Sequence, residues 1–134
     1  MGKTIKMNKE KFSFRKRWKS FGYAFNGLKV LFAEEHNSRI HLVAAVVAIA
    51  LGWALKLSMP EWVAISMVIG AVFAAELFNS AIENLADHLA PQKHETIKKV
   101  KDMAAAAVLV SAITAVAVAC FIFLPKIWEL FEKV

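Results

Sequence analysis

The sequence lacks several features on which folds and binding sites are commonly built. Its 134 residues include one cysteine and five glycines. The lone Cys120 excludes an intrachain disulfide. There is no glycine-rich GxxxxGK[ST] loop whose backbone amides would hold a phosphate, and no Cys/His spacing typical of a zinc site. Any phosphate chemistry would therefore depend on side chains and a bound metal ion.

Strand patterns, internal repeats and nucleophile-plus-base pairs are absent as well. Four scattered histidines are each expected to be surface or hinge residues rather than metal ligands: His36, His41, His88 and His94. No secretory signal is expected, because the first 39 residues are charged and contain no early apolar core. The absence of strand patterns leaves an all-α fold as the expected class.

Long apolar segments dominate what is present. Hydrophobic residues make up 58% of the chain, and three segments of 18, 24 and 22 residues are long enough to be membrane spans: Ile40–Leu57, Trp62–Leu85 and Met103–Leu124. A helix needs about 20 residues to cross the hydrocarbon core. Lys56 can extend to the interface, Pro60 suits the start of the second helix, and Pro125 is expected to close the third. We predict one membrane-embedded domain over residues 1–134 with three transmembrane helices.

Before the first span, large apolar residues recur at helical spacing. They are separated by 4, 3, 4, 3 and 4 positions, and basic residues fill the other faces: Phe14, Trp18, Phe21, Phe25, Leu28 and Phe32. This pattern predicts an amphipathic helix over about residues 12–33 that lies on the membrane surface. The alternative is a helix that packs into a soluble core.

The positive charge is unevenly placed. Ten of the 17 Lys and Arg residues precede Ile40 and four more lie in the 86–102 connection, so one side of the membrane holds fourteen. The positive-inside rule places this side in the cytoplasm. Because the basic residues flank membrane spans, we expect them to contact anionic lipid headgroups rather than nucleic acid.

One polar stripe interrupts the second span. Glu76, Asn79, Glu83 and Asp87 fall within less than a quarter-turn of a helix at about 100° per residue. An ionisable group inside a membrane span costs about 2.5–3.5 kcal/mol on insertion scales, which favours a functional role. Glu76 lies too deep in the span to be a solvated helix end. For Asp87, a solvated helix end and a functional role are equally good explanations.

Two further clusters lie on the predicted cytoplasmic side. Glu34 and Glu35 precede the first span, and either a solvated helix terminus or a Mg²⁺ site completed by a phosphate would explain them. Lys101 and Asp102 precede the third span. They can anchor that helix at the interface. Alternatively, Lys101 can bind a phosphate while Asp102 holds the lysine side chain in place.

Several of these residues resemble a known family in order and spacing. The run Glu76-Leu-Phe-Asn79-Ser-Ala-Ile-Glu83-Asn-Leu-Ala-Asp87, then His94-Glu95 and Lys101-Asp102-Met-Ala, resembles the prokaryotic diacylglycerol kinase family, which includes the undecaprenol kinases. The Gly22-Tyr23 and Gly27-Leu28-Lys29 elements and the Glu34-Glu35-His36-Asn37-Ser38-Arg39 hinge are similar too. The likeness covers roughly residues 12–125.

The resemblance implies a homotrimeric membrane kinase that transfers the γ-phosphoryl group of ATP to a lipid hydroxyl, with active sites shared between subunits. Its implied roles are a catalytic base (Glu76), a lipid-orienting amide (Asn79), Mg²⁺ ligands (Glu35, Glu83) and nucleotide contacts (Lys16, Tyr23, Glu35, Glu83, His94, Lys101, Asp102). Lys16 departs from the arginine of relatives, although Arg15 or Arg17 can substitute for it. Alanines at 104–107 stand where glycine is common.

The resemblance places the protein in the bacterial inner membrane, with the N-terminus and the active site in the cytoplasm. The hinge from Glu35 to His41 is more similar to undecaprenol kinases than to enterobacterial diacylglycerol kinases, which favours undecaprenol slightly as the acceptor. Two other readings of the stripe stay open. It can line a small oligomeric channel or proton pathway, or it can pair with a partner span in an assembly factor without chemistry.

Overall fold

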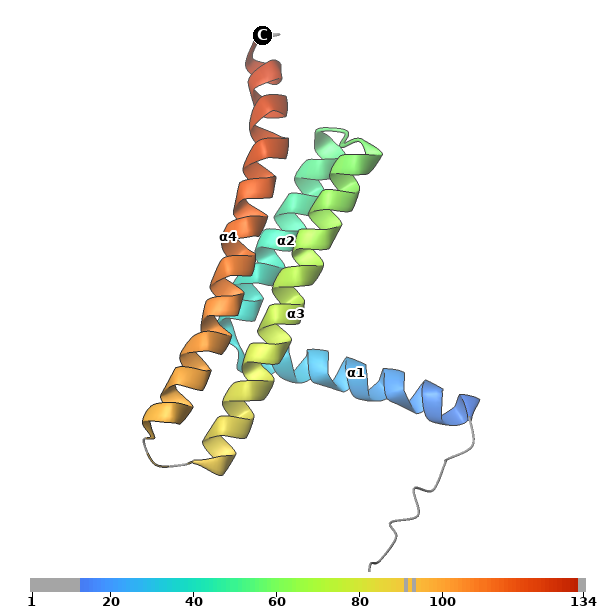
Figure 1. Ribbon diagram of the computed structural model, residues 1–134. Coiled ribbons are helices and arrows are strands. Elements are labelled where there is room, and N and C mark those ends of the chain that lie inside the picture. The colour runs from blue at the N-terminus through green and yellow to red at the C-terminus, as the bar shows by residue number, and fades with distance from the viewer. Residues whose placement is uncertain (1–12, 91, 93, 133–134) are drawn as a thin grey trace, which may run out of the picture.

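The computed structural model describes residues 13–90, 92 and 94–132, and all regular structure in this part of the chain is helical. The four helices are α1 (Phe14–Glu34), α2 (His36–Ala54), α3 (Met59–Leu89) and α4 (Glu95–Glu132). Helices α2, α3 and α4 run side by side, each antiparallel to the next along the chain, and α1 projects sideways from the bundle (Figure 1). The predicted all-α class is confirmed.

The junction between α1 and α2 is narrower than the predicted polar hinge. Only Glu35 leaves the helical conformation, with φ −97° and ψ 115°. Arg39 stabilises the bend, because its Nε donates to Phe32 O at 2.8 Å and its Nη2 donates to Ala33 O at 2.6 Å. These carbonyls end α1 and have no helical partner, so the guanidinium supplies one.

The aromatic face predicted for the first helix is exposed along α1. Phe14, Trp18, Phe21 and Phe25 are each more than half exposed within the single chain. Only the C-terminal part of α1 is buried, where Leu31 is 1% exposed and Phe32 meets Phe73 of α3 edge to face. An exposed apolar stripe opposite basic residues is typical of a helix that lies in the membrane interface.

The turn between α2 and α3 differs slightly from the predicted boundaries. Helix α2 ends at Ala54 rather than at residue 57, because Lys56 takes a left-handed conformation with φ 52°. Helix α3 then begins with a cap: the backbone N–H and the hydroxyl of Ser58 both donate to Glu61 Oε2 at 2.7 Å. Pro60 lies in the first turn of α3, as predicted.

The expectation that Pro125 closes the third helix is wrong, because α4 continues to Glu132. A proline inside a helix removes one hydrogen bond. Contacts on both sides of it hold the helix together here. Phe123 is 7% exposed in the core cluster, Ile127 packs against that cluster, and Lys126 Nζ lies 3.2 Å from Glu61 Oε2 of α3.

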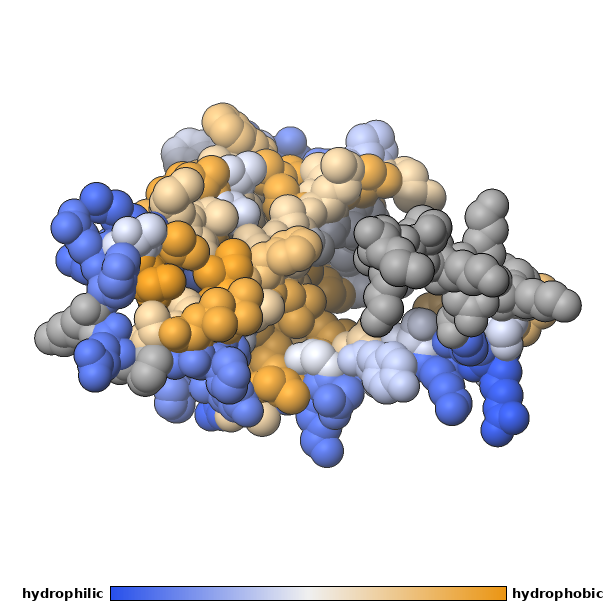
Figure 2. All heavy atoms as spheres, turned by 60° about the horizontal axis from the view of Figure 1, so that its bottom comes forward, coloured by the Kyte–Doolittle hydropathy of each residue, from blue (hydrophilic) through white to orange (hydrophobic). Residues whose placement is uncertain are grey.

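Among the described residues, three helices are long and apolar enough to cross a membrane, namely α2, α3 and α4. Little of their most apolar 18-residue stretches is buried within the chain: 17%, 22% and 6%. In the view that brings the α3–α4 connection forward, hydrophilic side chains lie at the left and along the lower edge, and apolar side chains fill the middle (Figure 2). Apolar surface on this scale requires lipid or other subunits to cover it.

Candidate functional site

The deepest polar side chain of the stripe is Glu76, which is 2% exposed on α3. His41 of α2 approaches it, with His41 Nε2 3.2 Å from Glu76 Oε1. The contact does not have hydrogen-bond geometry, so Oε1 has no hydrogen-bond partner among the described residues. Because a buried carboxylate normally has such partners, this oxygen is available to a ligand.

Two other buried polar side-chain atoms also lack a hydrogen-bond partner within the described chain. They are Ser38 Oγ on α2 and Asn79 Oδ1 on α3. Ser38 lies one turn before His41, and Asn79 lies one turn after Glu76. The three unpaired atoms therefore belong to facing turns of α2 and α3, where a bound hydroxyl or a neighbouring subunit would satisfy them.

Glu35 reaches α3 from the bend between α1 and α2. The hydroxyl of Ser80 donates to Glu35 Oε1 at 3.1 Å, and Ser80 is 6% exposed. On the same stretch of α3, Asn79 Nδ2 lies 3.5 Å from Glu83 Oε1. Ser80 stands between the positions of Glu76 and Glu83, so the bend brings a fourth carboxylate, that of Glu35, to the part of α3 that carries the predicted stripe.

The carboxylates of Glu35 and Glu83 have the oxygen chemistry that suits Mg²⁺. Within the ranges that the structure describes, however, no three His, Cys, Asp or Glu side chains gather closely enough to hold a metal ion. Mg²⁺ ordinarily takes one or two carboxylates and completes its shell with substrate phosphates and water. Two protein carboxylates therefore fit Mg²⁺ that arrives with a phosphate ligand.

A polar pocket of about 610 Å³ lies at the connection between α3 and α4. Its lining includes His94, Lys101, Asp102 and Asp87. Lys101 Nζ donates to Asp87 Oδ1 at 2.8 Å. Lys101 precedes the apolar stretch 103–124, and this hydrogen bond raises the pKa of Lys101 above its ordinary value. Asp87 thus has a partner on α4 instead of being only a solvated helix end.

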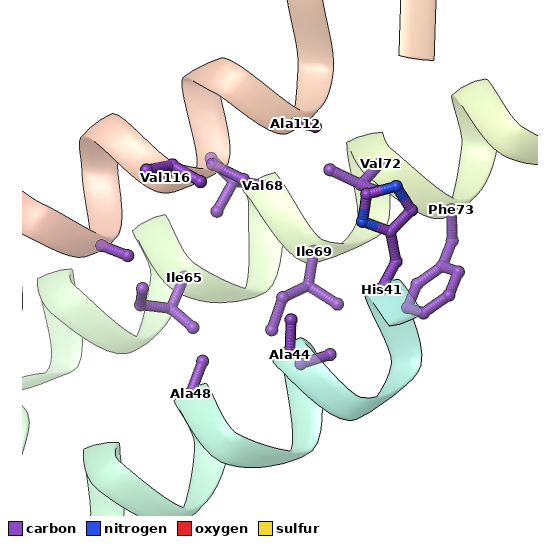
Figure 3. Close-up of a pocket in the computed structure, with 13 residues that line it drawn as sticks. His41, Ala44, Ala48, Ile65, Val68, Ile69, Val72, Phe73, Ala112 and Val116 are labelled. Atoms are coloured by element: carbon purple, nitrogen blue, oxygen red, sulfur yellow. The ribbon is translucent and has the colours of Figure 1, made fainter. Parts of the chain in front are cut away.

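An apolar cavity of about 170 Å³ lies between α2, α3 and α4. Figure 3 shows His41 and Phe73 at one end and Ala48 and Ile65 at the other. Alanine, valine and isoleucine side chains supply almost all of the wall, and His41 is the only polar residue among the described residues that line it. Since His41 also contacts Glu76, the cavity begins beside the buried carboxylate.

Two predicted site residues lie apart from these groups in the single chain. Lys16 and Tyr23 are on the exposed part of α1, and Tyr23 is 74% exposed. Neither residue lines the polar pocket at the α3–α4 connection. The helix that carries them projects away from the bundle (Figure 1).

Two contacts of the site were missed at the sequence level. Ser80 lies between Glu76 and Glu83 in the sequence but is not one of the four residues of the predicted stripe, and its partner, Glu35, is 45 positions away. His41 was expected to be a surface or hinge residue, yet it contacts Glu76. A signal for His41 did exist, because it is an ionisable residue inside the predicted first span.

Comparisons with known proteins agree on one family. A family model described as prokaryotic diacylglycerol kinase matches residues 22–123. The undecaprenol kinase of Bacillus subtilis (strain 168) is 37% identical over 110 residues, which cover 82% of this chain and 89% of that protein. The diacylglycerol kinase of Escherichia coli (strain K12) is 32% identical over 104 residues, 78% and 85% of the two chains. A Synechocystis sp. diacylglycerol kinase is 37% identical over 112 residues, 83% of this chain and 64% of that longer one.

Proposed function

The chain belongs to the prokaryotic diacylglycerol kinase family and is a lipid kinase, and from this premise we propose that it transfers the γ-phosphoryl group of ATP to a membrane-lipid hydroxyl. The observation that carries the proposal is the buried carboxylate of Glu76, whose Oε1 lacks a hydrogen-bond partner among the described residues. A carboxylate placed in this way can accept a proton from an alcohol.

In the proposed reaction, Glu76 takes the proton of the lipid hydroxyl. The hydroxyl oxygen forms a bond to the γ-phosphorus, and the bond between that phosphorus and the bridging oxygen breaks to leave ADP. Asn79 lies one turn along α3 and orients the acceptor. Phosphoryl transfer needs little covalent work from the protein, so positioning and charge neutralisation account for most of the catalysis.

Glu35 and Glu83 are the residues that would hold Mg²⁺, which supplies positive charge to the phosphates when it is bound. Ser80 supports the role of Glu35, because its hydroxyl anchors the carboxylate against α3. A carboxylate that is held in place by a hydrogen bond loses less freedom when it binds a cation. One Glu35 oxygen accepts from Ser80, and the other is not used by that contact.

The polar pocket at the α3–α4 connection is the proposed nucleotide site, with contacts from His94, Lys101 and Asp102. We expect Lys101→Met to raise KM for ATP about 10–100-fold, because a hydrogen bond to a charged group contributes about 1.5–3 kcal/mol. Lys99→Met is the matched control, since Lys99 is 70% exposed and does not line the pocket. Equal KM values for the two variants would remove Lys101 from the nucleotide site.

The apolar cavity supports a polyprenol as the acceptor. In a polyprenol, hydrocarbon begins at the carbon that bears the hydroxyl, whereas diacylglycerol places two ester groups near its hydroxyl. Among the described residues of the cavity wall, the esters would find no polar side chain except that of His41. A dry apolar cavity of about 150 Å³ can hold benzene, with six carbons. The 170 Å³ here is thus enough for about one five-carbon isoprene unit beside Glu76.

Filling this cavity tests the acceptor. Ala115 lines it from α4, and we expect Ala115→Leu to lower kcat/KM for undecaprenol about tenfold, because the larger side chain would occupy the space proposed for the lipid chain; a tenfold loss corresponds to about 1.4 kcal/mol. Ala117→Leu is the control, since Ala117 is exposed on the same helix and does not line the cavity. Wild-type kcat/KM for undecaprenol in the Ala115→Leu variant would rule out this cavity as the chain site.

A homotrimer with shared active sites would explain the position of α1. Lys16 and Tyr23 lie on a helix that projects away from the polar pocket of its own chain, so a neighbouring subunit's pocket is the one that they would serve. We further propose that the membrane is the bacterial inner membrane, with the N-terminus and the site in the cytoplasm. The excess of basic residues on that side supports this orientation.

One assay separates the kinase from the other readings. The purified protein receives Mg-ATP with undecaprenol, with diacylglycerol or with no lipid, and both ADP and lipid phosphate are measured. The proposal expects ADP in proportion to lipid phosphate and a higher kcat/KM for undecaprenol. A channel or an assembly factor would form no lipid phosphate, and that result would end the proposal.

A further inference from the structure

Ser38 is the most deeply buried polar side chain among the residues that the structure describes. It is 0% exposed on α2, and its Oγ has no hydrogen-bond partner within the described chain. The same face of α2 also buries Ala45 and Gly52, seven and fourteen positions further along. Alanine would fill this place without leaving a buried hydroxyl unpaired, so packing alone gives no reason for a serine here.

The bend before α2 removes the partner that a helical serine commonly uses. Such a serine donates to the carbonyl four positions earlier, as Ser111 does to Ala107 O at 2.9 Å. For Ser38 that position is Glu34, the last residue of α1, and Glu35 then leaves the helical conformation. The carbonyl therefore belongs to a different helix, and the hydroxyl of Ser38 does not bond to it.

Two contacts with α3 flank Ser38 along the chain. Glu35, three positions before it, accepts a hydrogen bond from Ser80. His41, three positions after it, lies 3.2 Å from Glu76. Because one helical turn takes about 3.6 residues, Ser38 lies between these contacts and faces the turn of α3 from Glu76 to Ser80.

Ser38 also lies just beyond one end of the apolar cavity. The cavity lining begins at His41 on α2 and reaches Phe73 on α3, and these two residues are at the same end (Figure 3). About one turn further, α2 carries Ser38 and α3 carries Glu76, each with an unpaired oxygen. A lipid alcohol whose chain occupies the cavity would bring its hydroxyl to these two oxygens.

We propose that Ser38 is an acceptor-binding residue whose hydroxyl donates a hydrogen bond to the oxygen of the lipid alcohol. This inference rests on the proposed function, which places the acceptor beside Glu76. An alcohol oxygen donates through one hydrogen and accepts through two lone pairs. Its O–H is directed at Glu76, one lone pair accepts from Ser38, and the other lone pair attacks the γ-phosphorus. Two fixed partners limit the rotation of the alcohol, and no bond to Ser38 is formed or broken.

The test begins with Ser38→Ala, assayed with Mg-ATP and undecaprenol. We expect kcat/KM for undecaprenol to fall about 3–10-fold, the effect of losing one neutral hydrogen bond. KM for ATP should stay at its wild-type value, because the polar pocket lies at the α3–α4 connection. Ser111→Ala is the matched control and should keep wild-type constants, since its hydroxyl bonds within its own helix and Ser111 does not line the cavity.

A second measurement separates binding of the hydroxyl from the shape of the chain site. A hydrocarbon with the undecaprenol chain but no hydroxyl is used as a competitive inhibitor. Ser38→Ala should leave its inhibition constant unchanged, because the hydrocarbon has no oxygen for Ser38 to bind. An inhibition constant that rises by the same factor as kcat/KM falls would show that Ser38 only shapes the site, and the proposal would be wrong.

A cysteine and a melting temperature complete the test. Ser38→Cys fills the same place with a weak donor, so it should also lose kcat/KM for undecaprenol, and wild-type kcat/KM in this variant contradicts the proposal even if Ser38→Ala does not fold. Removing an unpaired buried hydroxyl should not lower the Tm of the lipid-free protein. A lower Tm with unchanged kcat/KM in Ser38→Ala would mean that the hydroxyl bonds to a neighbouring subunit instead. Absence of lipid phosphate with the wild type would contradict the proposed function itself, so the two failures are distinguishable.

Discussion

Replacing Glu76 with glutamine is expected to lower kcat for lipid phosphorylation by about 10²–10⁴-fold, the contribution usual for general base catalysis. Glutamine keeps the size of the side chain but cannot accept the hydroxyl proton. Because Glu76 is 2% exposed, a carboxylate on the protein surface cannot take over its role at this buried position. The measurement is lipid phosphate formed per minute at saturating Mg-ATP and lipid.

The fold should survive this substitution. A neutral amide removes a buried charge, so Glu76→Gln is expected to assemble as wild type does and to elute at the same volume in size-exclusion chromatography. Glu129→Gln provides the control, since Glu129 is exposed near the end of α4, far along the helix from the site. Near-normal turnover in Glu76→Gln would show that another group is the base.

The second large effect is expected in the Mg²⁺ dependence of Glu35→Gln and Glu83→Gln. Each variant loses one of the two carboxylates proposed for the metal, and hard cations bind neutral amides less well than carboxylates. We expect the Mg²⁺ concentration for half-maximal rate to rise at least about tenfold in each. The measurement is a Mg²⁺ titration of kcat at fixed ATP.

A neighbouring residue makes the metal test specific. Glu34→Gln changes the same residue type next to Glu35, but Glu34 is exposed and ends α1. Its Mg²⁺ titration should match that of wild type. If both Glu35→Gln and Glu83→Gln also gave the wild-type titration, the metal would have to be held elsewhere.

The helices of this protein could be predicted well, and their ends less well. Length and hydropathy identified the three long apolar helices, because both are local properties of the chain. The end of α4 was missed at Pro125. A proline breaks an isolated helix, but here Lys126 pairs with Glu61 of another helix and the helix continues. Such a contact depends on residues 65 positions apart.

The polar stripe was predictable as a stripe, but its contacts were not. Helical spacing alone puts Glu76, Asn79 and Glu83 on one face. Spacing does not reveal that Glu35 bonds to Ser80, or that Asp87 bonds to Lys101 on the next helix. These pairs bring together segments that are separated by a bend or a connection, and the roles of the residues remain predictions for the assays above.

The sequence by itself determined the class of this protein: apolar runs that require a membrane, an aromatic helix suited to its surface, and acids that a membrane span carries only for a purpose. The tertiary structure alone decided that His41 meets Glu76 and that small side chains leave an apolar cavity beside them. The physical reason is that hydropathy and helical period are properties of neighbours in sequence, whereas a contact or a cavity depends on how three helices pack.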